Sequence, residues 1–255
     1  SMVWMVSLHQ LNSIQLLLLA LSVGCNSGSS AIVIAHELIH RKNRIMRNMG
    51  CLLLFSAGNN YFYVDHLKVH HKYVGTALDP ASARKGESLY AFFLRSMIGQ
   101  MSSAFRIEFK RLQTSNRNGW FIRNYVTRSI VCLFVLLSFA LWMWGGNIIL
   151  LFALQALVAN FLLEYTNYIE HYGLSRKDHE RVTENHSWQT DKVVSRYFLI
   201  DLSRHADHHY FASKPYHTLK SYDNSPRLPF GYVSMIYYAL IPPLFFKTVD
   251  PLIPR

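Results

Sequence analysis

Acidic residues and cysteines are scarce in this chain of 255 residues. It has 15 Asp and Glu against 26 Lys and Arg, which gives a formal net charge of +11. The basic residues are scattered beside hydrophobic segments, and no nucleic-acid-binding motif accompanies them, so we expect no nucleic acid partner. Attraction to anionic membrane lipid accounts for the charge more simply. The three cysteines stand apart from one another without a CxxC pair, which argues against a disulfide framework and a thiolate metal site.

Charge of either sign is missing from two long stretches, residues 1–36 and 129–163. Each exceeds the roughly 20 apolar residues that a helix needs to cross a bilayer. Only 16% of the chain is charged and 51% is apolar. The first stretch lacks the basic start of a signal peptide, so we expect a helix over about 15–35. The sequence therefore predicts an all-α integral membrane protein.

A transmembrane hairpin is predicted over residues 128–171. Two apolar segments, 130–144 and 148–168, are joined by Gly145, Gly146 and Asn147. The turn carries no basic residue, whereas the open ends are flanked by Arg123, Arg128, Arg176 and Lys177. Because basic residues near spans favour the cytoplasmic side, we expect both open ends in the cytoplasm.

Three shorter apolar runs, 48–64, 89–105 and 232–246, are expected at the membrane interface or on the cytoplasmic side. Residues 173–201 are polar and are expected to form a cytoplasmic loop with short helices. The chain starts at Ser1, without Met, and we expect a single domain over 1–255 that lacks its N-terminal transmembrane helices.

Nine histidines in four clusters are the most informative residues present. They are His36, His40, His66, His70, His71, His171, His205, His208 and His209. Neutral imidazole is the commonest protein metal ligand, and nine are enough for two ions. Histidines three or four apart share one face of a helix. We therefore expect the pairs 36/40, 66/70 and 205/208, with the histidines at 71 and 209 turned toward a second ion. His9, His179, His186 and His217 are expected in surface or supporting roles.

Four carboxylates, Glu37, Asp65, Glu170 and Asp207, lie beside these clusters and are expected to orient the imidazoles through their second ring nitrogen. Glu170 directly precedes His171 and is the best placed to reach a metal itself. All-imidazole sites suit zinc, copper or iron. Zinc in a structural site would close its shell with four ligands, whereas nine histidines over two ions leave the open positions that oxygen chemistry requires. Two iron ions fit best.

Beyond the histidines, four segments resemble those of the membrane alkane monooxygenases, relatives of the fatty acid desaturases. They are LDPASAR (78–84), NYIEHYGL (167–174), HSWQTD (186–191) and SPRLPFGY (225–232). The first, second and fourth histidine clusters look like the three histidine boxes of that superfamily. The likeness runs from about residue 31 onward. Asp65, Ser203, Ala206 and the Ala77–Leu78 pair depart from the usual pattern, and only three of the family's six spanning helices are evident.

The resemblance implies a cytoplasm-facing, histidine-rich di-iron domain that hydroxylates the terminal carbon of an alkane with O2. Electrons would come from rubredoxin and its NADH-dependent reductase. A bacterial inner membrane is expected, or an endomembrane in a eukaryote. The alternatives are a xylene-type or lipid hydroxylase or desaturase on the same site, and a truncated, inactive metal-binding protein. A substrate channel is expected along Leu17, Leu21, Trp142, Phe152 and Leu163.

Overall fold

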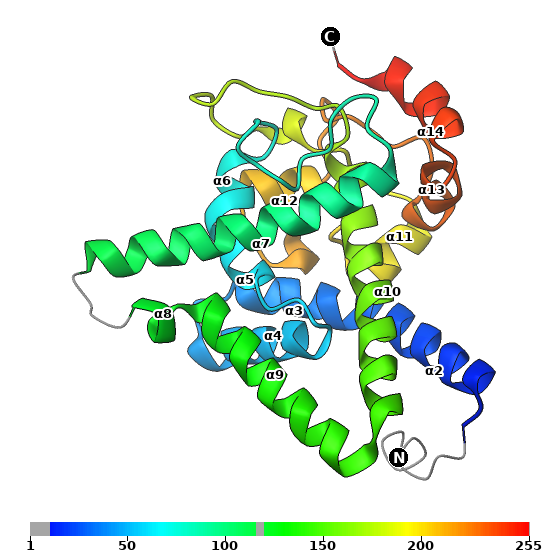
Figure 1. The fold of residues 1–255 in the computed structure, drawn as a ribbon. Helices are drawn as coiled ribbons and strands as arrows, with labels where there is room; N and C mark the ends of the chain where they lie inside the picture. Colours follow the sequence, from blue (N-terminus) through cyan, green and yellow to red (C-terminus); the bar gives the residue numbers. More distant parts are fainter. Residues whose placement is uncertain (1–10, 116–119, 255) are drawn as a thin grey trace.

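The computed structural model describes residues 11–115 and 120–254. Helices joined by loops make up this part of the chain, and its one β-type contact is an isolated bridge between Gln189 and Arg227. The all-α class is therefore confirmed for the described residues (Figure 1). His9 lies outside them.

Three helices are long and apolar enough to cross a membrane: Ser13–Ile39, Tyr125–Trp144 and Gly146–His171. The first combines α2 (Ser13–Asn26), the π-helical turn η1 (Ser27–Ala31) and α3 (Ile32–Ile39). The other two, α9 and α10, form the predicted hairpin. Gly145 separates them at φ +75°, a conformation that glycine adopts without a Cβ clash. The spans fall where the uncharged stretches predicted them.

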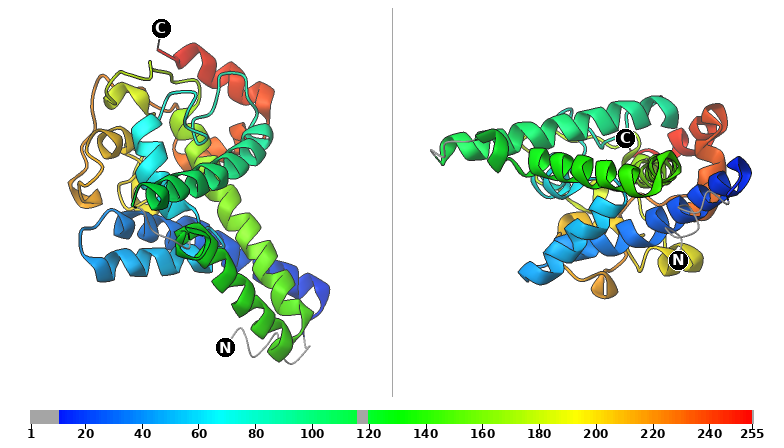
Figure 2. Two further views of the ribbon diagram at one scale, coloured as in Figure 1. Left: turned by 60° about the vertical axis from the view of Figure 1, so that its left-hand side comes forward. Right: turned by 60° about the horizontal axis from the view of Figure 1, so that its bottom comes forward.

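Helix α10 (Gly146–His171) is the element on which the others assemble (Figure 1). It packs against α2, η1, α7, α9 and α13. Glycines permit the close contact with the first span: a Cβ at Gly24 would lie 2.8 Å from the carbonyl oxygen of Gln155, and one at Gly28 would lie 3.2 Å from Cα of Ala159. Small residues let helices approach closely in this way in membranes. At the lower end of the α9–α10 hairpin, α2 lies beside α10 and packs on it through Leu16, Ala20 and Leu151 (Figure 2).

The shorter runs form further helices, and α7 among them packs on α10. Helix α4 (Arg44–Ser56) folds back on α3, and α5 (Phe62–Asp65), η2 (His66–His70) and α6 (His71–Tyr73) follow. Helix α7 (Leu89–Thr114) extends beyond its predicted end, and α8 (Trp120–Arg123) leads into α9. None of these is among the candidate spans.

The C-terminal third packs on the end of α10 through short helices. These are η3 (Glu184–His186), α11 (Val193–Phe198), α12 (His205–Tyr210), η4 (Tyr216–Thr218), α13 (Tyr232–Ala239), α14 (Pro242–Val249) and η5 (Asp250–Leu252). An apolar cluster that includes Tyr168, Tyr172, Trp188 and Phe245 holds them together. The apolar run 232–246 is interrupted at Pro242 and Pro243. Pro242 lacks an N–H and starts a new helix, so the run divides into α13 and α14.

Candidate metal centre

The fold brings all nine clustered histidines together. Five elements supply them: α3 and its C-cap, η2, α6, the end of α10, and α12. They form two groups in which the ligand atoms lie within 4.8 Å of one another. The five-histidine group contains His36, His40, His66, His71 and His208, and the four-histidine group contains His70, His171, His205 and His209.

In the five-histidine group, the Nε2 atoms of four histidines lie close together. Nε2 of His66 lies 2.5 Å from that of His36, 3.1 Å from that of His40 and 2.9 Å from that of His71. The Nε2 atoms of His40 and His71 are 3.2 Å apart. A neutral ring nitrogen either donates or accepts one hydrogen bond, so it cannot satisfy three imidazoles at once. Metal–nitrogen bonds of about 2.1 Å place neighbouring ligands about 3 Å apart, which matches this arrangement.

The four-histidine group is the more deeply buried and adjoins the first. Nε2 of His205 lies 3.3 Å from Nε2 of His171. The rings of His71 and His209 have centroids 4.6 Å apart, and those of His205 and His208 are 5.5 Å apart, so the two groups are neighbours. The arrangement can hold two metal ions side by side.

Two of the expected histidine pairs are wrong. His66 groups with His71, and His70 belongs to the other group. The reason is the π-helical turn: the backbone N–H of His71 donates to the carbonyl of His66, so these two residues are one π-turn apart. In α12, His205 groups with His209 four residues later, as on an ordinary helical face, while His208 points to the five-histidine group.

Buried ring nitrogens without a hydrogen-bond partner support metal binding by this donor set. Such nitrogens, buried without a partner, include both ring nitrogens of His208, both of His209, and Nε2 of His70. Unpaired polar atoms in a protein interior are costly, and a bound cation would satisfy them. The residues present therefore fit two imidazole-bound ions.

The environment keeps most of these imidazoles neutral, which is the form that binds metal. Burial, with the charge of His70, lowers the pKa of His40 to about 4. Burial, then neighbouring histidines, holds the pKa values of five others well below 6.5: His66, His71, His205, His208 and His209. For His70, burial acts in the same direction, but the Asp79 carboxylate outweighs it and raises the pKa.

Three of the four flanking carboxylates contact basic or hydroxyl side chains. Glu37 pairs with Arg41, Asp65 accepts a hydrogen bond from Ser103, and Asp207 pairs with Lys214. Asp207 also accepts from the Lys220 N–H at 2.6 Å and the Tyr222 hydroxyl at 2.8 Å. These groups satisfy Asp207, whereas Oε2 of Glu37 and Oδ2 of Asp65 are buried without a hydrogen-bond partner. Oε2 of Glu170, in contrast, lies 3.1 Å from Nε2 of His205.

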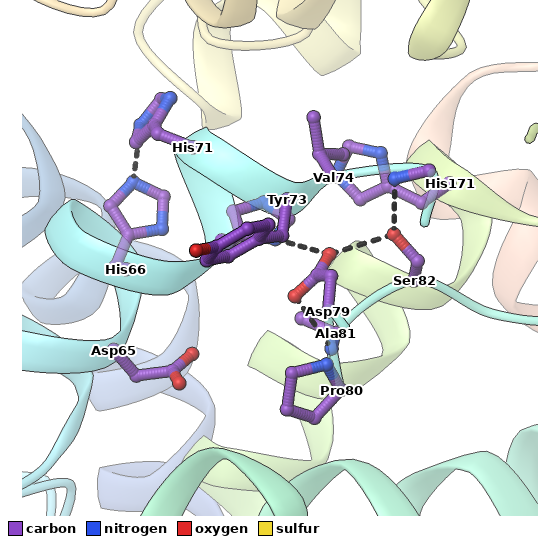
Figure 3. A network of polar contacts seen from close by, with 12 residues as sticks. Asp65, His66, His71, Tyr73, Val74, Asp79, Pro80, Ala81, Ser82 and His171 are labelled. Carbon is purple, nitrogen blue, oxygen red and sulfur yellow. Dashed lines mark hydrogen bonds and ion pairs between the residues drawn. The ribbon is translucent and has the colours of Figure 1, made fainter. Parts of the chain in front are cut away.

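Asp79 is a partner of the site that the sequence reasoning missed. Its Oδ2 lies 2.9 Å from Nδ1 of His70. The same oxygen accepts a hydrogen bond of 2.7 Å from the Ser82 hydroxyl (Figure 3). The contact leaves Nε2 of His70 for a metal. The signal was present, since Asp79 lies in the LDPASAR segment, but Asp79 is nine residues from His70 in the chain. The Tyr216 hydroxyl, also missed, contacts Nδ1 of His36.

An apolar cavity of about 250 Å³ reaches the histidines from the side of the first span. His36, His66 and His205 line one end of it, and residues of η1, α10, α11 and α13 form its walls. Of the five positions expected to line a channel, Leu163 lines this cavity, and Phe152 is not among its lining residues. Leu17, Leu21 and Trp142 are 46%, 41% and 78% exposed on outer surfaces of their helices.

Comparison with known proteins places this site in a family. The fatty acid desaturase family model matches residues 12–239. The chain belongs to the fatty acid desaturase family. Within it, the predicted resemblance to alkane monooxygenases is confirmed: the chain is 36% identical to an alkane 1-monooxygenase of Acinetobacter baylyi over 252 residues, 97% of this chain and 62% of that protein.

Two further relatives show how widely the sequence identity ranges. Alkane 1-monooxygenase 2 of Pseudomonas aeruginosa is 40% identical over 239 residues, 91% of this chain and 63% of that protein. The hydroxylase component of a xylene/toluene monooxygenase of Pseudomonas putida is 26% identical over 229 residues, 90% of this chain and 62% of that protein. The chain thus spans about three-fifths of the length of these relatives.

Proposed function

We propose that the protein is a membrane-bound, non-haem diiron monooxygenase that converts an alkane to its primary alcohol. The observation that carries the proposal is the convergence of nine histidines, as two adjoining groups, on the end of an apolar cavity. The names of the alkane 1-monooxygenases, which are 32–40% identical to this chain, support the substrate class.

One iron would be held by the five-histidine group and the other by the four-histidine group. Together they would supply the activation of O2, with one oxygen atom entering the substrate C–H bond and the other leaving as water after uptake of two electrons and two protons. Imidazole ligands suit iron, and nine of them over two ions leave open positions.

The chain's own residues position the reaction. The apolar walls of the cavity, among them Ile32, Leu163 and Ile236, would bind the hydrocarbon and exclude water from it. Asp79 fixes the ring orientation of His70, and the Tyr216 hydroxyl does so for His36. An alkane that partitions into the bilayer could enter between helices without crossing water.

We infer that both histidine groups face the cytoplasm and that the membrane is a bacterial inner membrane. The first span ends beside a basic cluster of Arg41, Lys42, Arg44 and Arg47, and basic residues also flank the hairpin ends. A soluble, acidic electron donor such as rubredoxin, reduced by its NADH-dependent reductase, would dock on this basic side.

A xylene-type methyl hydroxylase is the second candidate, and the 26% identity to the xylene/toluene hydroxylase component favours it over a desaturase.

Product analysis tests both candidate functions. The purified chain, loaded with iron and supplied with rubredoxin, reductase, NADH and ¹⁸O2, would receive octane, hexadecane or xylene. We expect ¹⁸O-labelled primary alcohol from an alkane, and none when His208 is replaced by Ala. Labelled product from xylene alone would favour the second candidate, and no labelled product from any substrate would contradict both.

A further inference from the structure

We propose that Glu170 is an oxygen ligand of the metal ion in the four-histidine group, and that Tyr232 holds its carboxylate in place. The proposal rests on the proposed di-metal function and adds a tenth ligand to the nine histidines. It also makes Tyr232, about sixty residues further along the chain, a positioning residue of the centre.

The carboxylate of Glu170 is buried at the end of α10 and has two side-chain contacts. Glu170 is 1% exposed. Oε1 accepts a hydrogen bond of 2.7 Å from the Tyr232 hydroxyl, and Oε2 lies 3.1 Å from Nε2 of His205. Tyr232 is itself fixed at the start of α13, where its N–H donates to Ser195 and its carbonyl accepts from the Tyr165 hydroxyl. The orientation of Oε2 toward the histidines is therefore set by the fold.

The contact with His205 is best explained as a contact between two ligands. Nε2 of His205 also lies 3.3 Å from Nε2 of His171, so it is this nitrogen that faces the other ligands of the group. A ring nitrogen that binds a metal through its lone pair has no proton to donate to a carboxylate. If Nε2 holds the ion, Oε2 of Glu170 has only the ion itself as a favourable partner.

Charge leads to the same conclusion. Within residues 11–115 and 120–254, no Lys or Arg forms an ion pair with Glu170. Asp207, which is buried just as deeply, pairs with Lys214, and the half-buried Glu87 pairs with Arg95. A buried carboxylate is paired with a cation, coordinates a metal, or is neutralised. Glu170 has no such cationic side chain as a partner, and a metal ion bound beside His205 would be available for its carboxylate to coordinate.

The two groups also differ in the number of donors. One has five imidazoles and the other four. Glu170 lines the apolar cavity together with His36, His66 and His205, so its oxygen would lie on the side of the four-histidine ion that faces the substrate. The cavity would then meet one ion with nitrogen ligands alone and one ion with a mixed set, which makes the two ions chemically distinct.

The test is metal binding by the purified full chain in detergent, stripped of metal and titrated with Co²⁺. We expect the wild type to bind two ions. Glu170→Gln keeps the size of the side chain and an acceptor for Tyr232, but lacks the anionic ligand. It should bind one of the two ions at least about tenfold more weakly and intensify the visible absorption of that ion, because four-coordinate Co²⁺ absorbs more strongly than five-coordinate Co²⁺. Glu108→Gln, whose carboxylate pairs with Arg111 on α7, is the matched control and should leave both ions unchanged.

A second measurement uses the wild type, so the test does not depend on the folding of a variant. With ¹³C-labelled glutamate, the infrared difference between metal-free and Zn²⁺-loaded protein should show a carboxylate stretch that shifts on metal binding. Two ions bound with equal affinity and equal spectra in Glu170→Gln, or no carboxylate shift in the wild type, would overturn the role of Glu170 while leaving the proposed function intact. A wild type that takes up no ion would overturn both.

Discussion

Replacement of Asp79 by Asn should weaken the binding of one metal ion and leave the other unchanged. Asp79 contacts Nδ1 of His70 at 2.9 Å, and His70 is the only histidine of the second cluster that belongs to the four-histidine group. The carboxylate both orients the ring and increases its basicity, whereas an uncharged amide increases the basicity of the ring only weakly. The perturbation therefore acts on one centre through one ligand.

Loss of a carboxylate that orients a metal-binding histidine typically reduces metal affinity 10- to 100-fold, which corresponds to about 1.4–2.8 kcal/mol. Asp79 also stabilises its own loop, because it accepts hydrogen bonds from the Ser82 hydroxyl at 2.7 Å and the Ala81 N–H at 3.1 Å. Ser82→Ala removes the first of these contacts and also the hydrogen bond of 2.8 Å that the Gly75 N–H donates to the Ser82 hydroxyl, so it should reduce stability by about 1–3 kcal/mol with little change in metal affinity.

The assay is Co²⁺ or Zn²⁺ titration of the metal-free chain, with metal content measured after dialysis. Asp178→Asn, on the exposed loop after α10, is the control and should behave as the wild type. The reasoning is refuted if Asp79→Asn binds both ions with wild-type affinity, or if both ions weaken equally. Equal weakening would mean that Asp79 supports the fold of the whole centre and does not act through His70.

Three further predictions concern packing, the cavity and pH. Gly24→Ala, whose Cβ would lie 2.6 Å from Cβ of Val158, should reduce stability by about 1–3 kcal/mol in thermal unfolding, whereas Gly146→Ala, with nothing within 4 Å, should not. Leu163→Phe should shorten the longest alkane hydroxylated, and Leu21→Phe, on an exposed surface, should leave the chain-length profile unchanged; equal profiles for both would exclude the cavity as the substrate site. In the metal-free protein, His40 should reduce stability as the pH falls from about 6.5 toward 4, because the unfolded chain protonates this imidazole in that range while the folded chain, in which burial lowers its pKa to about 4, does not. Burial raises the pKa of Asp65 to about 8, and this group acts in the opposite direction, so the contribution of His40 is measured as the difference between the wild type and His40→Gln. Urea unfolding of both at a series of pH values measures this difference, and a difference that is the same at pH 6.5 and pH 4 would contradict the prediction.

The sequence was sufficient to predict the spans and the set of histidines, because both depend on local patterns. Absence of charge over residues 1–36 and 129–163 identifies membrane helices without knowledge of packing, and the clusters are visible as short repeats of histidine. Membrane orientation then restricted where the clusters could meet.

The distribution of histidines between the two groups could not be predicted, because it depends on backbone geometry that the pattern does not reveal. A π-helical turn places His71 beside His66, and no residue type in the sequence HLKVH predicts this turn. Asp79 and Tyr216 reach their histidines from loops and turns distant in sequence. Charged neighbours also determine the contacts of two carboxylates: Glu37 pairs with Arg41 and Asp207 with Lys214, whereas their closeness in sequence to the histidines had suggested that they orient imidazole rings.

The iron content of the folded, purified chain tests the central claim most directly. After reconstitution with Fe²⁺ under anaerobic conditions and removal of unbound metal, we expect two iron ions per chain, with a loss of about one in His209→Ala and of about one in His40→Ala, since each belongs to a different group. Less than one iron per wild-type chain, in protein shown to be folded by circular dichroism, would contradict the diiron centre.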